Sequence, residues 1–180
     1  IPPAIHPDTT LVLNADDPLV ACFARGHAPD RVKWFGLERW SGDTEAPRGV
    51  YRDGALCPVC KRPMEYDFYH YAHIGAYRCP ACGHRRPKPD FAVTELDLAA
   101  GRLVLDGDTP IQLSFRSIYN VYNILAAWSV SRLCGVEKDT AAGVINHYIL
   151  KNGRMVQFTL GAHRGTLLTS KHENSVAYDT

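Results

Sequence analysis

The chain has 180 residues, of which 46% are hydrophobic and 22% are charged, and its formal net charge is +1. A chain of this length and composition can bury a core of its own, which argues against a disordered or fibrous protein. The near-zero net charge excludes a strong global field for nucleic acid or acidic lipid, and no apolar run approaches the length of a membrane span.

The first elements along the chain alternate between strand and helix. A β-rich run predicts a strand at residues 10–14, and Asp16 and Asp17 are typical of a helix start. A short helix at residues 19–25 and a strand at residues 31–36 follow. This order predicts a parallel βαβ unit.

The second half of the chain predicts further strands and two helices. Apolar runs with strand character flank the small residues at 99–101 and predict a hairpin, and two longer stretches have helical spacing. The predicted elements are, in order, strands at 91–97, 102–106 and 111–115, helices at 118–133 and 137–150, and strands at 155–160 and 166–169.

Composition divides the chain into three parts. A polar linker follows Trp40 and leads into a cysteine-rich stretch, which ends in a basic, proline-broken segment. We therefore predict an α/β domain with a mainly parallel sheet, formed by residues 1–49 and 91–180 and interrupted by an insertion at residues 50–90.

The ends of the chain carry two further expectations. The first ten residues lack both the charged and the apolar region of a signal peptide, so a cytoplasmic location is the default. The chain does not begin with Met and its last residues complete no element, so we expect a piece of a larger enzyme.

Four cysteines have the spacing of a metal site. Cys57 and Cys60 form one Cys-x2-Cys pair, 18 residues separate it from the second pair, and Cys79 and Cys82 form that second pair. Each short spacing lets one turn present two sulfurs to a single ion, and thiolates favour zinc. Gly83 can adopt a positive φ, which turns backbone N–H groups toward the sulfurs. We predict a structural zinc site, with two reducible disulfides as the alternative.

The stretch between the two pairs predicts the strands of a zinc ribbon. Aromatic residues and His70 alternate with polar residues across positions 65–70. His70, His73 and His84 are alternative ligands, although four cysteines already complete a tetrahedron.

Basic residues around the second pair leave open another class of function, a zinc ribbon that binds nucleic acid or protein. An aromatic residue, Tyr77, lies close to them, which is compatible with phosphate contacts and stacking. The patch is short and the chain is nearly neutral, so we expect no nucleic-acid partner. The basic residues are Arg78, His84, Arg85, Arg86 and Lys88.

Several separated motifs together resemble the central domain of the Mur ligase superfamily. They are LNADDP at 13–18, YNVYNILAA at 119–127, GRM at 153–155 and SKHEN at 170–174. Within that superfamily, an insertion that contains YAHIGAYRCPACG at 71–83 resembles the MurT family of ligase subunits. The resemblance covers nearly the whole chain, and the order of the motifs together with the inserted ribbon makes it specific.

The resemblance implies an ATP- and Mg-dependent ligase subunit of peptidoglycan synthesis. The family amidates the D-glutamate of the lipid II stem peptide to D-isoglutamine through an acyl phosphate. Ammonia comes from a GatD-like glutaminase, so the resemblance also implies a heterodimer. Another ligase, an amino-acid-adding Mur enzyme or a folylpolyglutamate synthase, is the alternative within the superfamily.

The resemblance also implies nucleotide-binding residues. Asn123 faces the adenine and Asn120 supports the same turn, while Arg154 lies near the ribose. Thr169 stands where relatives often carry an Asp that grips the ribose hydroxyls, and Lys171 is directed toward phosphate or a substrate carboxylate. No catalytic residue can be assigned from these motifs.

One motif of the superfamily does not occur in this stretch. The sequence contains no GxxxxGK[ST] phosphate loop, which the family carries upstream of the central domain, as it carries a substrate domain downstream. We therefore expect these 180 residues alone to be inactive.

Overall fold

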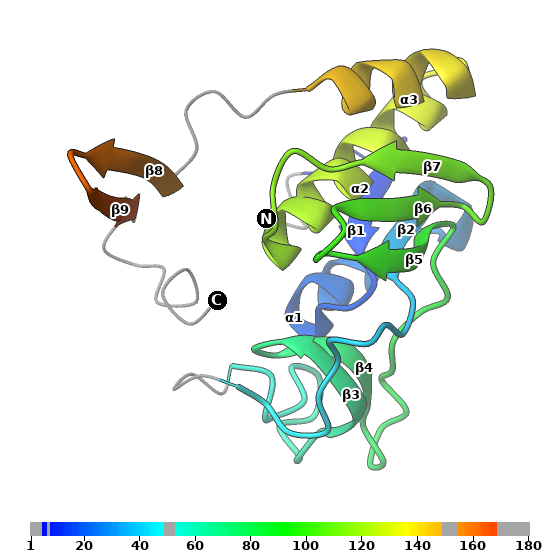
Figure 1. Ribbon diagram of the computed structural model, residues 1–180. Coiled ribbons are helices and arrows are strands. Elements are labelled where there is room, and N and C mark those ends of the chain that lie inside the picture. The colour runs from blue at the N-terminus through cyan, green and yellow to red at the C-terminus, as the bar shows by residue number, and fades with distance from the viewer. Residues whose placement is uncertain (1–4, 7, 49–52, 149–154, 169–180) are drawn as a thin grey trace.

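The computed structural model describes residues 5–6, 8–48, 53–148 and 155–168. Its largest unit is a five-stranded sheet, which Figure 1 shows with its helices. The strands, in spatial order, are β1 (Leu11–Asn14), β2 (Val32–Leu37), β5 (Phe91–Asp97), β6 (Arg102–Leu105) and β7 (Thr109–Gln112).

The sheet is mainly parallel in direction, as predicted. β1 pairs in parallel with β2, and β2 pairs in parallel with β5. β6 pairs antiparallel with both β5 and β7, so it alone runs against the other four strands. The predicted hairpin at 91–106 is therefore confirmed, and it continues into β7.

The largest differences from the predicted strands are in β7 and β9. β7 ends at Gln112 rather than at residue 115, and it begins at Thr109 rather than at residue 111, because Asp106 and Gly107 both have positive φ and return the chain at once to pair with β6. β9 (His163–Leu168) begins at residue 163 rather than 166. A turn with Gly161 at φ +60 brings it back against β8 (Met155–Leu160), and the two form a separate antiparallel sheet.

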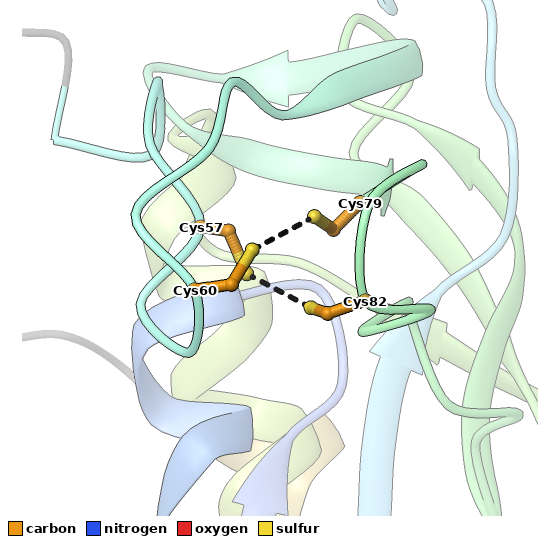
Figure 2. A group of neighbouring side chains, drawn as sticks. All are labelled: Cys57, Cys60, Cys79 and Cys82. Atoms are coloured by element: carbon orange, nitrogen blue, oxygen red, sulfur yellow. Dashed lines mark hydrogen bonds between the residues drawn. The ribbon is translucent and has the colours of Figure 1, made fainter.

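The cysteine-rich insertion is built on a second hairpin. Its strands are β3 (Glu65–Tyr71) and β4 (Ile74–Arg78), which pair antiparallel as the alternation predicted. The four cysteines lie beside this hairpin (Figure 2), and Figure 1 shows the hairpin next to α1 (Pro18–Ala21). The backbone of Thr44 bonds to that of Tyr69 in both directions, which attaches the hairpin to the segment after β2.

The predicted helix at residues 19–25 is shorter than expected. Asp17 caps α1, since its carboxylate accepts from the backbone N–H of Leu19 and Val20. A 3-10 turn, η2 (Cys22–Ala24), continues it, and a second one, η3 (Pro29–Arg31), precedes β2. Arg25 is already extended, so only one α-helical turn forms.

Two longer helices complete the fold. α2 (Ile118–Leu133) has the predicted bounds, whereas α3 (Lys138–His147) ends earlier than residue 150, because Tyr148 is already extended. Residues 149 and 150 lie outside the described residues. None of the helices within the described ranges combines the length and the apolar character that crossing a membrane requires.

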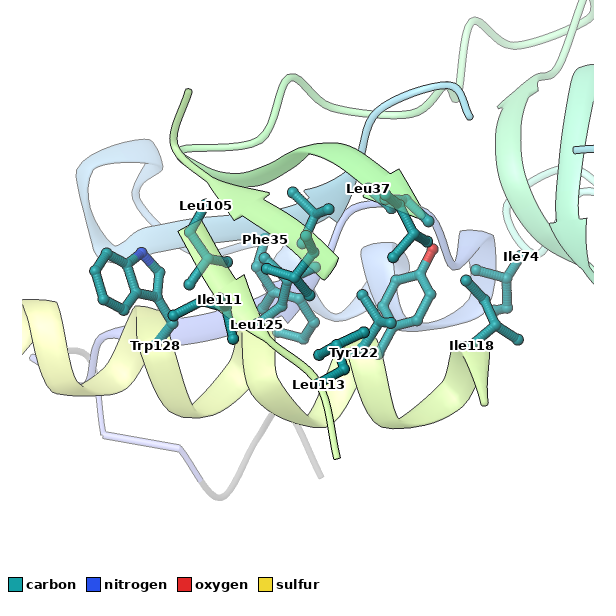
Figure 3. Close-up of a cluster of buried hydrophobic side chains, with 14 of the residues drawn as sticks. Phe35, Leu37, Ile74, Leu105, Ile111, Leu113, Ile118, Tyr122, Leu125 and Trp128 are labelled. Atoms are coloured by element: carbon teal, nitrogen blue, oxygen red, sulfur yellow. The ribbon is translucent and has the colours of Figure 1, made fainter. Parts of the chain in front are cut away.

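The core lies between α2 and one face of the sheet. Buried residues of α2 recur at helical spacing and meet buried side chains of β2, β5, β6 and β7 (Figure 3). Ile74 of the inserted hairpin belongs to the same cluster and lies near Ile118 at the start of α2. The insertion therefore contributes to the core of the α/β body.

Candidate functional site

The four cysteines of the two Cys-x2-Cys pairs come together. Their sulfur atoms all lie within 4.8 Å of one another (Figure 2). The Sγ atoms of Cys57 and Cys82 are 3.6 Å apart, and those of Cys60 and Cys79 are 3.5 Å apart, so all four are free thiols. A zinc–sulfur distance of about 2.3 Å implies sulfur–sulfur edges of about 3.8 Å in a tetrahedron. The four sulfurs could thus hold one metal ion.

Two similar turns present these sulfurs. In the first turn, the N–H of Lys61 donates to the carbonyl of Cys57, and in the second the N–H of Gly83 donates to the carbonyl of Cys79. Lys61 has φ 61 and Gly83 has φ +74, the positive value predicted for Gly83. The residue after each second cysteine therefore turns the chain back over the sulfurs.

The surroundings shift the pKa values of Cys79 and Cys82 in opposite directions. Burial opposes ionisation of Cys79, but backbone N–H groups of Cys82 and Ala81 outweigh it and lower the pKa of Cys79 to about 7. The N–H of His84 favours the thiolate of Cys82, yet burial and the neighbouring thiols together raise the pKa of Cys82 to about 12. The surroundings thus favour the thiolate of Cys79 over that of Cys82, and a metal ion would displace protons from the thiols that bind it.

The histidines of this region contact other groups. His70 Nδ1 lies 2.6 Å from Asp43 Oδ1, and its Nε2 lies 3.0 Å from the carbonyl oxygen of Leu37. His84 Nε2 lies 3.2 Å from the carbonyl oxygen of Pro18. These contacts, and the all-cysteine composition of the cluster in the described part of the chain, favour the four-cysteine set.

A buried polar network connects the segment after the second cysteine pair to α2, and sequence reasoning missed it. Asp16 is 0% exposed, and its carboxylate accepts three hydrogen bonds. Arg86 Nε donates at 2.6 Å, the backbone N–H of Leu37 at 2.7 Å and the hydroxyl of Tyr122 at 2.7 Å. Asp16 and Asp17 look alike in sequence, but Asp17 caps the helix and Asp16 points inward.

The network joins two acidic side chains, Asp16 and Asp43, to the basic side chains of His70 and Arg86. His70 Nδ1 contacts the carboxyl group of Asp43, and its Nε2 contacts the carbonyl oxygen of Leu37. Burial alone would lower the pKa of Arg86, but the carboxylate of Asp16 raises it above the ordinary value. Burial first, and then the charge of Asp16, hold the pKa of Tyr122 well above its usual range.

The structure brings together two of the predicted nucleotide-binding residues. Asn123 is exposed, and its Nδ2 donates to Asn120 Oδ1 at 3.0 Å. Asn120 Nδ2 donates in turn to Ser117 Oγ at 2.7 Å. The Tyr122–Asp16 bond places the first turns of α2 near the carboxyl end of β1, the edge where open α/β sheets bind ligands.

Three of the predicted nucleotide-binding residues cannot be placed in this way. Arg154, Thr169 and Lys171 lie outside the described residues. Their roles stay predictions.

Two residues of the basic patch are committed to carboxylates. Arg78 donates to Glu65 and to Asp67 on β3, and Arg86 is bound to Asp16. The basic patch therefore presents less free positive charge than its sequence indicated.

The amino-acid sequence is similar to two known ligase subunits. No model of a known protein family matches the chain. The chain is 32% identical over 170 residues to lipid II isoglutaminyl synthase (glutamine-hydrolyzing) subunit MurT of Streptococcus pneumoniae, which is 92% of this chain and 37% of that protein. It is 31% identical over 148 residues to MurT of Staphylococcus aureus, covering 82% of this chain and 33% of that protein.

A solved structure shares the architecture. A pseudomurein peptide ligase type C from Methanothermus fervidus superimposes with a TM-score of 0.74 at 25% sequence identity, over 94% of this chain and 33% of that chain. The chain thus spans about a third of the length of the proteins it matches. Over most of its own length, the chain is a homologue of one segment of the MurT ligase subunits.

Proposed function

We propose that this chain is part of an ATP-dependent ligase subunit that amidates the D-glutamate of the lipid II stem peptide to D-isoglutamine. In this proposal ATP converts the carboxylate to an acyl phosphate, and ammonia from a GatD-like glutaminase displaces the phosphate. A carboxylate is a poor electrophile, so phosphorylation supplies the leaving group. The protein then acts by holding the reacting groups in position.

The observation that carries this proposal is the similarity to MurT over 92% of the chain. The peptide-ligase architecture supports it independently, since the TM-score of 0.74 extends over 94% of the chain. Because the chain spans only about a third of these relatives, the phosphate loop and the substrate-binding residues belong, in this proposal, to other parts of the protein.

The four cysteines fit a structural zinc ion in this proposal. Their sulfurs are close enough for a tetrahedron, and four thiolates leave no position open for a substrate. When bound, zinc supplies folding energy to a unit that has little core of its own. The residues that hold it are Cys57, Cys60, Cys79 and Cys82.

The nucleotide end of the site is assigned to α2 and to the segment after it. An amide such as Asn123 offers both the donor and the acceptor that an adenine edge requires, and Asn120 fixes its orientation. Arg154 and Thr169 are assigned to the ribose, and Lys171 to phosphate or a carboxylate. We assign Mg to the phosphates of ATP.

The nucleotide assignment is tested in the intact ligase with its glutaminase partner. Asn123→Ala removes a group that pairs with adenine, so we expect the KM for ATP in lipid II amidation to rise about tenfold. Glutamine hydrolysis by the partner uses no ATP and should not change. Cys134→Ser, an exposed change at the other end of α2, is the matched control. An unchanged ATP dependence in a folded Asn123→Ala protein would refute the assignment.

A zinc ribbon that binds nucleic acid is the alternative from another class. It gains little support from the structure, since Arg78 and Arg86 are held by acidic side chains and Ile74 ties the ribbon to the core. A steep loss of DNA or RNA binding with salt would favour it.

A further inference from the structure

Asp16 is the meeting point of three parts of the molecule. Its carboxylate accepts hydrogen bonds from three donors. They are the side chain of Arg86 after the second cysteine pair, the backbone N–H of Leu37 at the end of β2 and the hydroxyl of Tyr122 on α2. Asp16 is 0% exposed, so no water shell can substitute for a lost donor at no cost. Because the three contacts share one carboxylate, the loss of one contact changes the position and the charge environment of the acceptor in the other two.

The position of Arg86 depends on the metal-binding turn. After Cys82 the chain folds back along β4, where the N–H of Cys79 donates to the carbonyl of His84 at 2.7 Å. Two residues later, the N–H of Arg86 donates to the carbonyl of Tyr77 at 2.9 Å. A metal ion bound by Cys79 and Cys82 would fix this turn. Without the ion, the backbone hydrogen bonds that place Arg86 beside Tyr77 would be less constrained.

The other side of Asp16 reaches the proposed nucleotide-binding helix. Tyr122 is buried and directly precedes Asn123, and its hydroxyl bond to Asp16 fixes this turn of α2 against the end of β1. Arg86 also donates to the carbonyl of Leu37 at 3.0 Å, so the same side chain holds the end of β2. Arg86 binds Oδ1 of Asp16, whereas Leu37 and Tyr122 both donate to Oδ2. Without Arg86, the buried carboxylate loses its closest cation, and only the backbone N–H of Leu37 still holds the oxygen that accepts from Tyr122.

We propose that Arg86 and Asp16 are positioning residues that couple occupancy of the four-cysteine metal centre to the order of the first half of α2, residues 118–125. This inference rests on the proposed metal centre. The ribbon then has a role beyond its own stability, because a bound ion keeps the first turns of α2, which carry Asn120 and Asn123, in an ordered position.

The coupling is measured by amide hydrogen exchange on the chain with one zinc ion and after removal of zinc by a chelator. In the unmodified chain, zinc removal should speed exchange in residues 118–125 by about tenfold or more, the change expected for one lost hydrogen bond to a charged group. In Arg86→Gln, exchange there should already be fast with zinc bound, and zinc removal should add little. Arg85→Gln, an exposed neighbour, should behave like the unmodified chain.

A second variant guards against misfolding. Tyr122→Phe keeps the buried ring and removes only the hydroxyl that binds Asp16, so it should keep zinc and lose the zinc dependence in residues 118–125. Full zinc dependence in Tyr122→Phe, or in folded Arg86→Gln, would overturn the coupling, since a purely structural role slows or speeds exchange without removing that dependence. If the chain binds one zinc ion but its removal leaves exchange in residues 118–125 unchanged, the coupling is overturned and the metal centre stands. If the chain binds no zinc, both the metal centre and the coupling are overturned.

Discussion

Single residues in the left-handed backbone region shape both turns that carry the cysteine pairs. Gly83 adopts φ +74 at no steric cost, and a Cβ added there would meet nothing within 4 Å. Lys61 holds the equivalent position of the first turn at φ 61, where a side chain strains the backbone. The two turns thus have similar backbone geometry, but only the second turn has glycine, the residue that adopts a positive φ without strain.

This asymmetry predicts opposite effects of reciprocal substitutions. Gly83→Ala should lower the free energy of unfolding by about 1 kcal/mol, because only the backbone conformation opposes it. Lys61→Gly should leave that free energy unchanged or raise it by up to about 1 kcal/mol. Denaturant unfolding of the zinc-loaded proteins measures both values. Equal losses in the two variants would show that the turns are not equivalent.

One buried and two half-buried tyrosines predict how stability depends on pH in the alkaline range. Burial raises the pKa of Tyr71 to about 12, and it raises the pKa of Tyr66 and Tyr77 further. The unfolded chain releases these protons near pH 10, so the stabilisation is complete below about pH 10 and is lost as the pH rises through the folded values. Each pKa unit corresponds to about 1.4 kcal/mol.

We therefore expect tyrosinate absorbance from these residues to appear together with the loss of helical circular dichroism above about pH 10. Ionisation of all the tyrosines in a chain that stays folded would contradict the burial of these rings.

At the scale of elements, the β3–β4 hairpin is part of the core. Ile74 is 5% exposed and packs in the cluster of α2 and the sheet, and the rings of Tyr71 and Tyr122 meet edge to face. The α/β body and the insertion therefore share apolar contacts in addition to the network around Asp16. A ribbon that is attached in this way should not unfold by itself.

Truncation of one side chain tests this attachment. Ile74→Ala should lower the free energy of unfolding of the whole chain by about 2–5 kcal/mol, because it leaves a cavity in the shared core. Leu56→Ala is the matched control, since Leu56 lies in the same insertion and is 54% exposed. The two variants are compared by denaturant unfolding followed through tryptophan fluorescence. If Ile74→Ala cost no more than the control, the ribbon would fold independently of the body.

The elements that sequence could predict were those with strong local signals. The spacing of apolar residues predicted the bounds of α2, and the two cysteine pairs predicted the four-cysteine cluster. The alternation of aromatic and polar residues predicted β3. The start of β7 was predicted two residues too late, although Asp106-Gly107 is a typical two-residue hairpin turn in the sequence. The role of Asp16 could not be predicted. Arg86 and Tyr122 lie 70 and 106 residues away from it, and only the folded chain brings them together.

At the scale of the whole molecule, the chain matches one segment of longer ligase proteins. It spans 37% of the MurT of Streptococcus pneumoniae and 33% of the peptide ligase structure that it matches. In the proposed enzyme this segment supplies the nucleoside end of the ATP site on α2, and the metal centre holds that helix through Arg86 and Asp16. In this proposal, other parts of the enzyme complete phosphate transfer and substrate binding.

The central claim is that the enzyme which contains this chain amidates lipid II, and the mass of the product tests it most directly. The intact ligase and its glutaminase partner are incubated with lipid II, ATP and glutamine, and the stem peptide is analysed by mass spectrometry. We expect the mass to fall slightly, because an amino group replaces a hydroxyl on the D-glutamate carboxyl, and we expect this change to require both ATP and glutamine. An unchanged lipid II, or a product heavier by an added amino acid, would contradict the account.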